Sequence, residues 1–161
     1  MTDAEDALAD LLGDLDPTMW ILTVADGGER RGCLMGFATQ TSLEPPRFLA
    51  CVSRANHTFA LAVRAEHVAV HAAPDEADLA LARLFGEETG DDIDKFARCE
   101  WHEGPARQPI LVACPAWFVG RVVARHDLGD HVGLLLDPVA VQGRLTHVLT
   151  FARAQDLDAA H

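Results

Sequence analysis

The sequence lacks several features that mark particular classes of protein. No apolar run approaches the roughly 20 residues that a bilayer-spanning helix needs, and residues 1–12 are acidic where a secretory signal is basic. The four cysteines form no Cys-x-x-Cys pair, and the eight histidines include no His-Glu-x-x-His motif. We therefore expect a cytoplasmic protein that has buried free thiols, binds no metal and does not contact membranes.

Signatures of several enzyme classes are also missing. The chain contains no Gly-x-Ser-x-Gly motif, no Gly-rich Rossmann or P-loop fingerprint and no carboxylate pair at catalytic spacing. Its 161 residues, 49% hydrophobic and 24% charged, are ordinary for one globular domain with a substantial core. The sequence thus predicts a folded domain without assigning a protein nucleophile or a nucleotide-binding loop.

Charge is distributed unevenly along the chain. The formal net charge is -12, which disfavours nucleic acid as a partner, and residues 1–29 carry eight acids and no base. Residues 30–64 carry five arginines against the single acid Glu44. This basic segment suits a small anion such as a phosphate, and the alternative is that its arginines are solvated or paired with the acidic flanks. The five are Arg30, Arg31, Arg47, Arg54 and Arg64.

Residue patterns predict a mostly β fold with peripheral helices. Because regular β-α-β alternation is absent, an antiparallel barrel with helices packed outside it is favoured. We expect one domain over residues 1–161, divided into an N-terminal helix (1–15), a barrel core (16–141) and a C-terminal strand or tail (142–161). Helices are expected within 3–15, 56–65 and 75–88, with Asp3 and Asp75 near two of the starts; strands are expected in a hairpin over 19–41 and within 47–53, 67–73 and 110–143.

Two adjoining stretches favour binding of a flat ligand that carries an anion. Small and hydroxyl residues from Gly36 to Ser42 let a flat ring approach the backbone, and Pro45 and Pro46 then begin the next strand at a defined angle. The segment Ser53–Thr58 precedes a short helix, where free amides favour a phosphate. The alternative is a purely structural turn and helix cap.

Three segments in order resemble the flavin reductase-like family of FMN-binding split barrels. They are GCLMGFATQTSLEPPRFLACVSRANHTF, LARLFGEETGDDIDKF and PILVACPAWFVGRVVARHDLGDHVGLLLDPVAV, and the match runs from Asp16 to Val141. The resemblance implies an antiparallel split β-barrel, a homodimer of six-stranded barrels, and one flavin per subunit near the dimer interface. FMN is favoured over FAD.

The resemblance also implies site residues. The ring and ribityl chain would lie along 34–40 and the phosphate along 51–58, while His131 of the Gly-Asp-His turn would touch the nicotinamide. The family often has a polar triplet where this chain has Leu34, Met35 and Gly36, so backbone groups or nearby polar side chains would substitute. The implied cofactor-binding residues are Leu34, Met35, Gly36, Thr39, Gln40, Thr41, Cys51, Ser53, Arg54, Asn56, His57 and Thr58.

The expected function is hydride transfer from NAD(P)H to FMN, which needs no covalent protein intermediate because the flavin carries the chemistry. A partner monooxygenase would be one consumer of the reduced flavin. Two alternatives remain open: a flavoprotein with another electron donor, and a flavin carrier without efficient turnover. The acidic N-terminal helix would cover the barrel, join the dimer interface or bind a partner.

Overall fold

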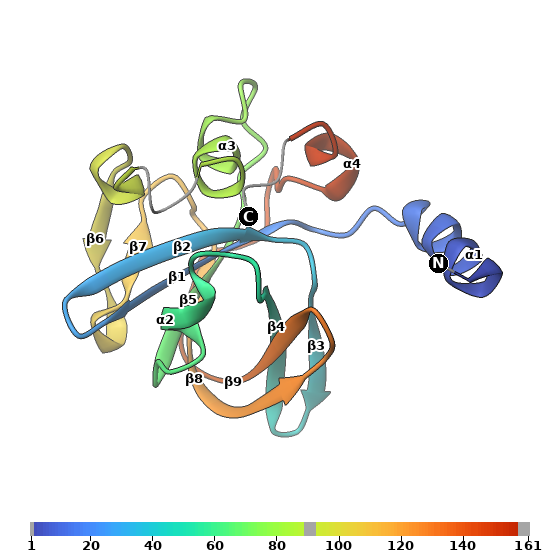
Figure 1. Ribbon diagram of the computed structural model, residues 1–161. Coiled ribbons are helices and arrows are strands. Elements are labelled where there is room, and N and C mark those ends of the chain that lie inside the picture. The colour runs from blue at the N-terminus through green and yellow to red at the C-terminus, as the bar shows by residue number, and fades with distance from the viewer. Residues whose placement is uncertain (1, 89–92, 158–161) are drawn as a thin grey trace.

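A curled sheet of seven antiparallel strands organises the computed structural model, which describes residues 2–88 and 93–157 (Figure 1). The strand order is β2-β1-β5-β8-β9-β4-β3, and β6 and β7 pair separately. The predicted class, antiparallel β with peripheral helices, is confirmed. The strands are β1 Trp20–Asp26, β2 Glu29–Met35, β3 Ala38–Leu43, β4 Pro46–Ser53, β5 His67–Ala72, β6 Trp101–Glu103, β7 Pro109–Leu111, β8 Trp117–Asp127 and β9 His131–Gln142.

The hairpin expected over residues 19–41 consists of β1, β2 and a separate strand β3. Gly27 and Gly28 form its turn with φ of 57° and 85°, which glycine adopts readily. At Gly36 and Phe37 the chain leaves β1 and continues as β3, which pairs with β4. This break gives seven strands rather than the expected six, and it makes β2 and β3 the two edges of the sheet.

The helices differ from the expected ones in where they begin. Thr2, not Asp3, caps the first helix through a capping box with Glu5. The third helix starts at Ala80 rather than near Asp75, because Leu79 adopts a left-handed φ of 54° and interrupts the pattern. The helices are α1 Asp3–Gly13, α2 Phe59–Ala62, α3 Ala80–Gly86 and α4 Phe151–Ala154, with 3-10 turns at Lys95–Ala97 and Pro105–Arg107.

Some predicted segments extend beyond the described residues. Met1 of the N-terminal helix, residues 89–92 of the Leu-Phe-Gly segment and residues 158–161 of the tail lie outside them. Before residue 158 the tail makes two single bridges, Thr18 with Thr150 and Pro74 with Val148, and helix α4. Within residues 2–88 and 93–157, no helix is both long and apolar enough to cross a membrane.

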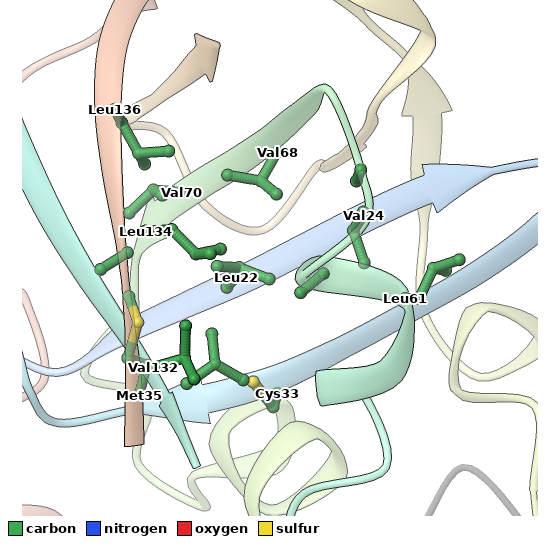
Figure 2. Close-up of a cluster of buried hydrophobic side chains, with 14 residues drawn as sticks. Leu22, Val24, Cys33, Met35, Leu61, Val68, Val70, Val132, Leu134 and Leu136 are labelled. Atoms are coloured by element: carbon green, nitrogen blue, oxygen red, sulfur yellow. The ribbon is translucent and has the colours of Figure 1, made fainter. Parts of the chain in front are cut away.

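The main core fills the inside of the curled sheet (Figure 2). Alternate residues of five strands point inward, as the two-residue period of a strand requires, and α2 covers them with Leu61. A second cluster lies on the other side of β1, where Ile21 packs with Phe85 of α3 and with Phe96. The labelled inner residues are Leu22, Val24, Cys33, Met35, Leu61, Val68, Val70, Val132, Leu134 and Leu136.

The cysteines match the expectation of free thiols. Cys33 and Cys114 are buried, whereas Cys51 and Cys99 are half-buried, and all four are free. Burial raises the pKa of Cys33 to about 11 and of Cys114 to about 12, so both thiols stay protonated near neutral pH. Among the described residues, no group of three or more His, Cys, Asp or Glu side chains is placed to hold a metal ion.

The buried ring of His71 joins β5 to β1 and β7. Its Nδ1 lies 3.1 Å from the Ile21 carbonyl oxygen, and its Nε2 accepts a hydrogen bond of 3.1 Å from the Leu111 amide. Because Nε2 accepts, Nδ1 carries the proton and the ring is neutral. Burial lowers the pKa of His71 from 6.5 to about 4.

We expect this histidine to make folding stability fall as the pH drops below 6.5. The unfolded chain binds a proton near pH 6.5 and the folded chain only near pH 4, so the unfolded state binds more protons between these values. Stability is fully present above pH 6.5 and falls by about 1.4 kcal/mol per pH unit within that window. Urea unfolding across the window measures the slope. A His71→Gln variant should have a shallower slope, and parallel slopes would contradict the prediction.

Candidate functional site

Three connections far apart in the sequence meet at one end of the curled sheet. They are the link between β2 and β3, the turn after β4, and the turn between β8 and β9. The Cys51 amide donates to the Phe37 carbonyl oxygen at 2.9 Å, and Ser53 pairs with His131 in the register of β4 and β9. The predicted ring-binding segment and the predicted nicotinamide-contacting histidine are therefore neighbours.

Phe37 and His131 form an aromatic pair at this meeting point. Their ring centroids lie 4.9 Å apart at an interplanar angle of 51°. Phe37 is 64% exposed, so the pair presents apolar ring surface to solvent. The sequence did not reveal Phe37 as a site residue, since an aromatic beside a strand is more often part of the core.

Asp130 orients the imidazole of His131. The Nδ1–H of His131 donates to the Asp130 carboxylate at 2.7 Å, which leaves Nε2 as the nitrogen able to meet a ligand. The hydrogen bond and charge of His131 lower the pKa of the Asp130 carboxyl. A histidine held by a neighbouring carboxylate can hydrogen-bond a ligand in a fixed orientation.

Arg54 connects the turn after β4 to the turn between β8 and β9. Its Nε donates to the Gly129 carbonyl oxygen and its Nη2 to the Asp127 carboxylate, both at 2.9 Å. The guanidinium also lies 5.6 Å from the Phe59 ring centroid, and its hydrogen bond lowers the pKa of Asp127. The guanidinium thus has a structural role in positioning His131, and its predicted contact with a phosphate stays a prediction.

Side chains of the 53–58 segment stabilise their own turn. The Ser53 hydroxyl accepts from the Ala55 amide at 3.3 Å, and the Asn56 side-chain oxygen accepts from the Thr58 amide at 2.8 Å. The helix that follows, α2, contains only Phe59–Ala62. The structural turn raised as an alternative for this segment is therefore present, whereas the helix cap is not, because the Thr58 side chain makes no capping hydrogen bond to α2. Binding of a phosphate here stays a prediction.

A cavity of about 400 Å³ adjoins this turn and is bordered by three cations. Arg30, Arg31 and Lys95 outnumber the two lining carboxylates, so the cavity is locally basic in a strongly acidic protein. Of the predicted phosphate-binding residues, His57 and Thr58 lie in its wall. The lining residues are Glu29, Arg30, Arg31, Gly32, His57, Thr58, Ile93, Asp94, Lys95 and Phe96.

Two of these cations are fixed by backbone oxygens. Arg31 donates from Nη1 to the His57 carbonyl oxygen at 2.8 Å, which ties the basic strand β2 to the turn. Lys95 is buried and donates from Nζ to the carbonyl oxygens of Gly32, at 3.1 Å, and Phe85, at 3.2 Å. Burial lowers the pKa of Lys95. The charge pattern indicated the arginines of β2, but nothing in the sequence connected Lys95 with them.

The remaining predicted residues fall into two groups. Met35 is buried in the inner core and Leu34 packs against Gly86, so these two offer a ligand their backbone groups rather than their side chains. Thr39, Gln40 and Thr41 are exposed on β3. Gln40 lines a different, apolar cavity, so the structure does not bring its side chain together with His131.

Asp137 has a clear structural role. Its carboxylate accepts from Arg47 at 2.7 Å and from Arg121 at 3.1 Å, which ties β4 and β8 to β9. Arg47, one of the basic-segment arginines, is therefore paired within the protein. Arg31 and Arg64 pair with the acidic flank itself, at Glu29 and at Asp26 and Glu29, so much of the basic segment follows the alternative of ion pairing within the protein.

The curled antiparallel sheet and the linked turns define a split-barrel fold, with an exposed aromatic pair at His131 and a basic cavity at His57 and Thr58. The chain belongs to the flavin reductase like domain family, whose sequence model matches residues 13–156. This confirms the family that the three segments indicated.

Individual relatives agree with this assignment. The chain is 34% identical over 125 residues to HsaB, the reductase subunit of a flavin-dependent monooxygenase from Rhodococcus jostii, covering 75% of this chain and 60% of HsaB. It is 27% identical over 147 residues to the FMN reductase (NADH) RutF of Bradyrhizobium diazoefficiens, covering 90% of this chain and 81% of RutF. The chain thus spans about three fifths of HsaB but most of RutF.

A solved structure supports the fold independently. The crystal structure of a flavin reductase domain protein from Arthrobacter matches with a TM-score of 0.79 at 22% identity, covering 91% of this chain and 89% of that one. At this level of identity the likeness establishes the fold, while the chemistry depends on the residues of this chain.

Proposed function

We propose that this protein is an FMN-binding oxidoreductase that acts as an NAD(P)H-dependent flavin reductase in one domain, residues 1–161. The observation that carries the proposal is the meeting of the Gly36–Phe37 link with His131, next to a turn whose far end borders a basic cavity. The naming of RutF as an FMN reductase (NADH) supports FMN as the flavin and NADH as the donor. FAD is the less favoured flavin.

The residues present suit a flavin mononucleotide. The ring and ribityl chain would use backbone groups from Leu34 to Gly36 and the exposed hydroxyls of β3. The phosphate would meet the wall formed by Cys51–Thr58 and the basic cavity, where Arg31 supplies charge. A Cβ built on Gly36 would meet only Met19, at 3.6 Å, so packing within the chain does not require glycine there. This supports the proposal that the ligand approaches the backbone closely at Gly36.

Bound flavin would supply the hydride-accepting chemistry, and the protein would supply position and environment. His131, held by Asp130, would direct Nε2 toward the nicotinamide. Phe37 would cover part of the same surface and exclude water. Arg54 would keep the two turns together, so that the distance between the phosphate-binding and nicotinamide-binding parts stays fixed.

We further propose a cytoplasmic homodimer that can serve a partner monooxygenase. The naming of HsaB as the reductase subunit of a monooxygenase supports such a partner. The four free thiols agree with a reducing compartment. The homodimer follows from the resemblance to the flavin reductase-like family.

A visible absorption spectrum recorded without oxygen tests the function. Protein equilibrated with FMN is expected to show flavin bands that bleach within seconds of adding NADH, and a parallel sample with NADPH identifies the preferred donor. Bands that persist with both donors would leave a flavoprotein or carrier of another kind. Failure to bind FMN at all would overturn the assignment.

The same assay tests His131. A His131→Ala variant should reduce flavin about tenfold more slowly, the equivalent of one lost hydrogen bond of about 1.4 kcal/mol, and should keep its affinity for FMN. His126, exposed on β8, provides the matched control, and His126→Ala should behave as the unmodified protein. Equal rates in the two variants would remove His131 from the nicotinamide site.

A further inference from the structure

Helix α1 lies apart from the rest of the protein (Figure 1). None of its residues is buried, although Leu8, Leu11, Leu12 and the following Leu15 form one apolar stripe with exposures of 56%, 64%, 47% and 56%. An isolated helix of this length is marginal in water, even with a good cap. The stripe therefore needs a surface to cover it.

The segment that connects α1 to β1 is fixed to the rest of the protein. Thr18 bridges to Thr150, the Met19 amide donates to the Leu149 carbonyl oxygen at 2.8 Å, and the Phe151 amide donates to the Pro17 carbonyl oxygen at 2.9 Å. These contacts anchor the connecting segment beside α4, and from there the chain leads α1 outward (Figure 1).

A second apolar surface lies where the first residues of β1, β4 and β8 meet the last residues of β9. It is a mainly apolar groove of about 360 Å³, walled by aromatic side chains of β1, β4 and β8 and by the end of β9. Val141 and Leu145 border it with exposures of 73% and 58%. The aromatic side chains are Trp20, Phe48, Trp117 and Phe118.

The charges around the two surfaces are opposite. Helix α1 and the residue after it carry five acids and no base: Asp3, Glu5, Asp6, Asp10 and Asp14. The groove carries Arg47 and Arg144 at its rim, with Arg121 nearby. Arg47 and Arg121 share the single carboxylate of Asp137, and Arg144 makes no ion pair with a described residue. The rim is therefore positive overall.

We propose that α1 of each chain docks in the apolar groove of a second copy, with its leucine stripe inward and its acids against the arginine rim. This inference rests on the homodimer proposed above, not on the reductase activity. Two such contacts, related by a twofold axis, cover both α1 helices and fill both grooves, so the assembly closes as a dimer. It assigns the N-terminal helix to the dimer interface, one of the three roles that its sequence left open.

Disulfide trapping between copies tests the contact directly. One preparation carries Leu11→Cys and another Val141→Cys; the two are mixed and oxidised, and the linked peptides are identified by mass spectrometry. A disulfide between residue 11 of one chain and residue 141 of another is expected. Each variant oxidised alone is the control. Absence of this linkage from the oxidised mixture would overturn the proposal.

Sedimentation velocity separates this inference from the proposed homodimer. Leu11→Glu should weaken dimerisation at least tenfold, whereas Ala9→Glu, which adds the same charge away from the stripe, should change it less than twofold. Leu11 is exposed, so its replacement does not endanger the folding of the chain. A dimer unaffected by Leu11→Glu would overturn the docking of α1 and leave the homodimer standing, and an unmodified chain that stays monomeric would overturn both.

Discussion

An Arg31→Ala variant is expected to bind FMN at least tenfold more weakly than the unmodified protein, with much less effect on riboflavin. Arg31 borders the basic cavity and donates to the His57 carbonyl oxygen at 2.8 Å, so it contributes charge and holds the turn proposed to receive the phosphate. A hydrogen bond to a charged group contributes about 1.5–3 kcal/mol, which corresponds to a factor of about 10 to 150 in affinity. Riboflavin has no phosphate, so its affinity should change little.

Quenching of flavin fluorescence during titration measures both affinities. Arg31→Lys keeps the charge but loses the forked geometry of the guanidinium. Its affinity for FMN should lie between those of the unmodified protein and Arg31→Ala. The matched control is Arg153→Ala, because Arg153 lies on α4 and pairs with Asp75 outside the cavity. Equal losses for FMN and riboflavin would show that Arg31 acts on the ring-binding region instead, and unchanged FMN affinity would place the phosphate elsewhere.

The parts of the fold that could be predicted are those specified by local sequence. Gly27 and Gly28 mark the β1–β2 turn because both adopt positive φ, and β4 begins at Pro46, one residue before the expected strand. The predicted start of α3, near Asp75, was wrong by several residues, because the helix begins at Ala80. Helical spacing continues through Leu79, but its left-handed backbone, with the Asp78 carboxylate accepting from the Ala80 amide at 3.1 Å, delays the helix.

The candidate site was predictable only in part, because long-range contacts assemble it. The charge pattern of the basic segment indicates Arg31. Lys95 borders the same cavity and binds the Gly32 carbonyl oxygen, although it lies 63 residues after Gly32 in the sequence. The segment around Arg54 predicts a phosphate contact, but nothing local to it indicates that the guanidinium also binds Asp127, 73 residues away. Local patterns identify the charged residues, but the topology of the sheet determines which groups those residues contact.

Gly143→Ala is expected to be among the most destabilising single substitutions in the chain, costing at least about 3 kcal/mol. Gly143 follows β9 with φ of 88°, and an added Cβ would lie 1.9 Å from the Pro115 carbonyl oxygen and 2.9 Å from the Ala116 Cα. Both neighbours are backbone atoms, so no side-chain rotation can relieve the overlap. The end of β9 or the start of β8 must move.

Gly28→Ala separates this overlap from backbone strain. Gly28 has φ of 85°, but an added Cβ would meet nothing within 4 Å, so only the conformational cost of about 1–2 kcal/mol applies. Urea unfolding of the two variants gives the difference, which we expect to exceed 1 kcal/mol.

Gly143 also lines the apolar groove, so movement of β9 there should weaken dimerisation as well. Equal stability of the two variants would mean that β8 and β9 can separate at this end without cost.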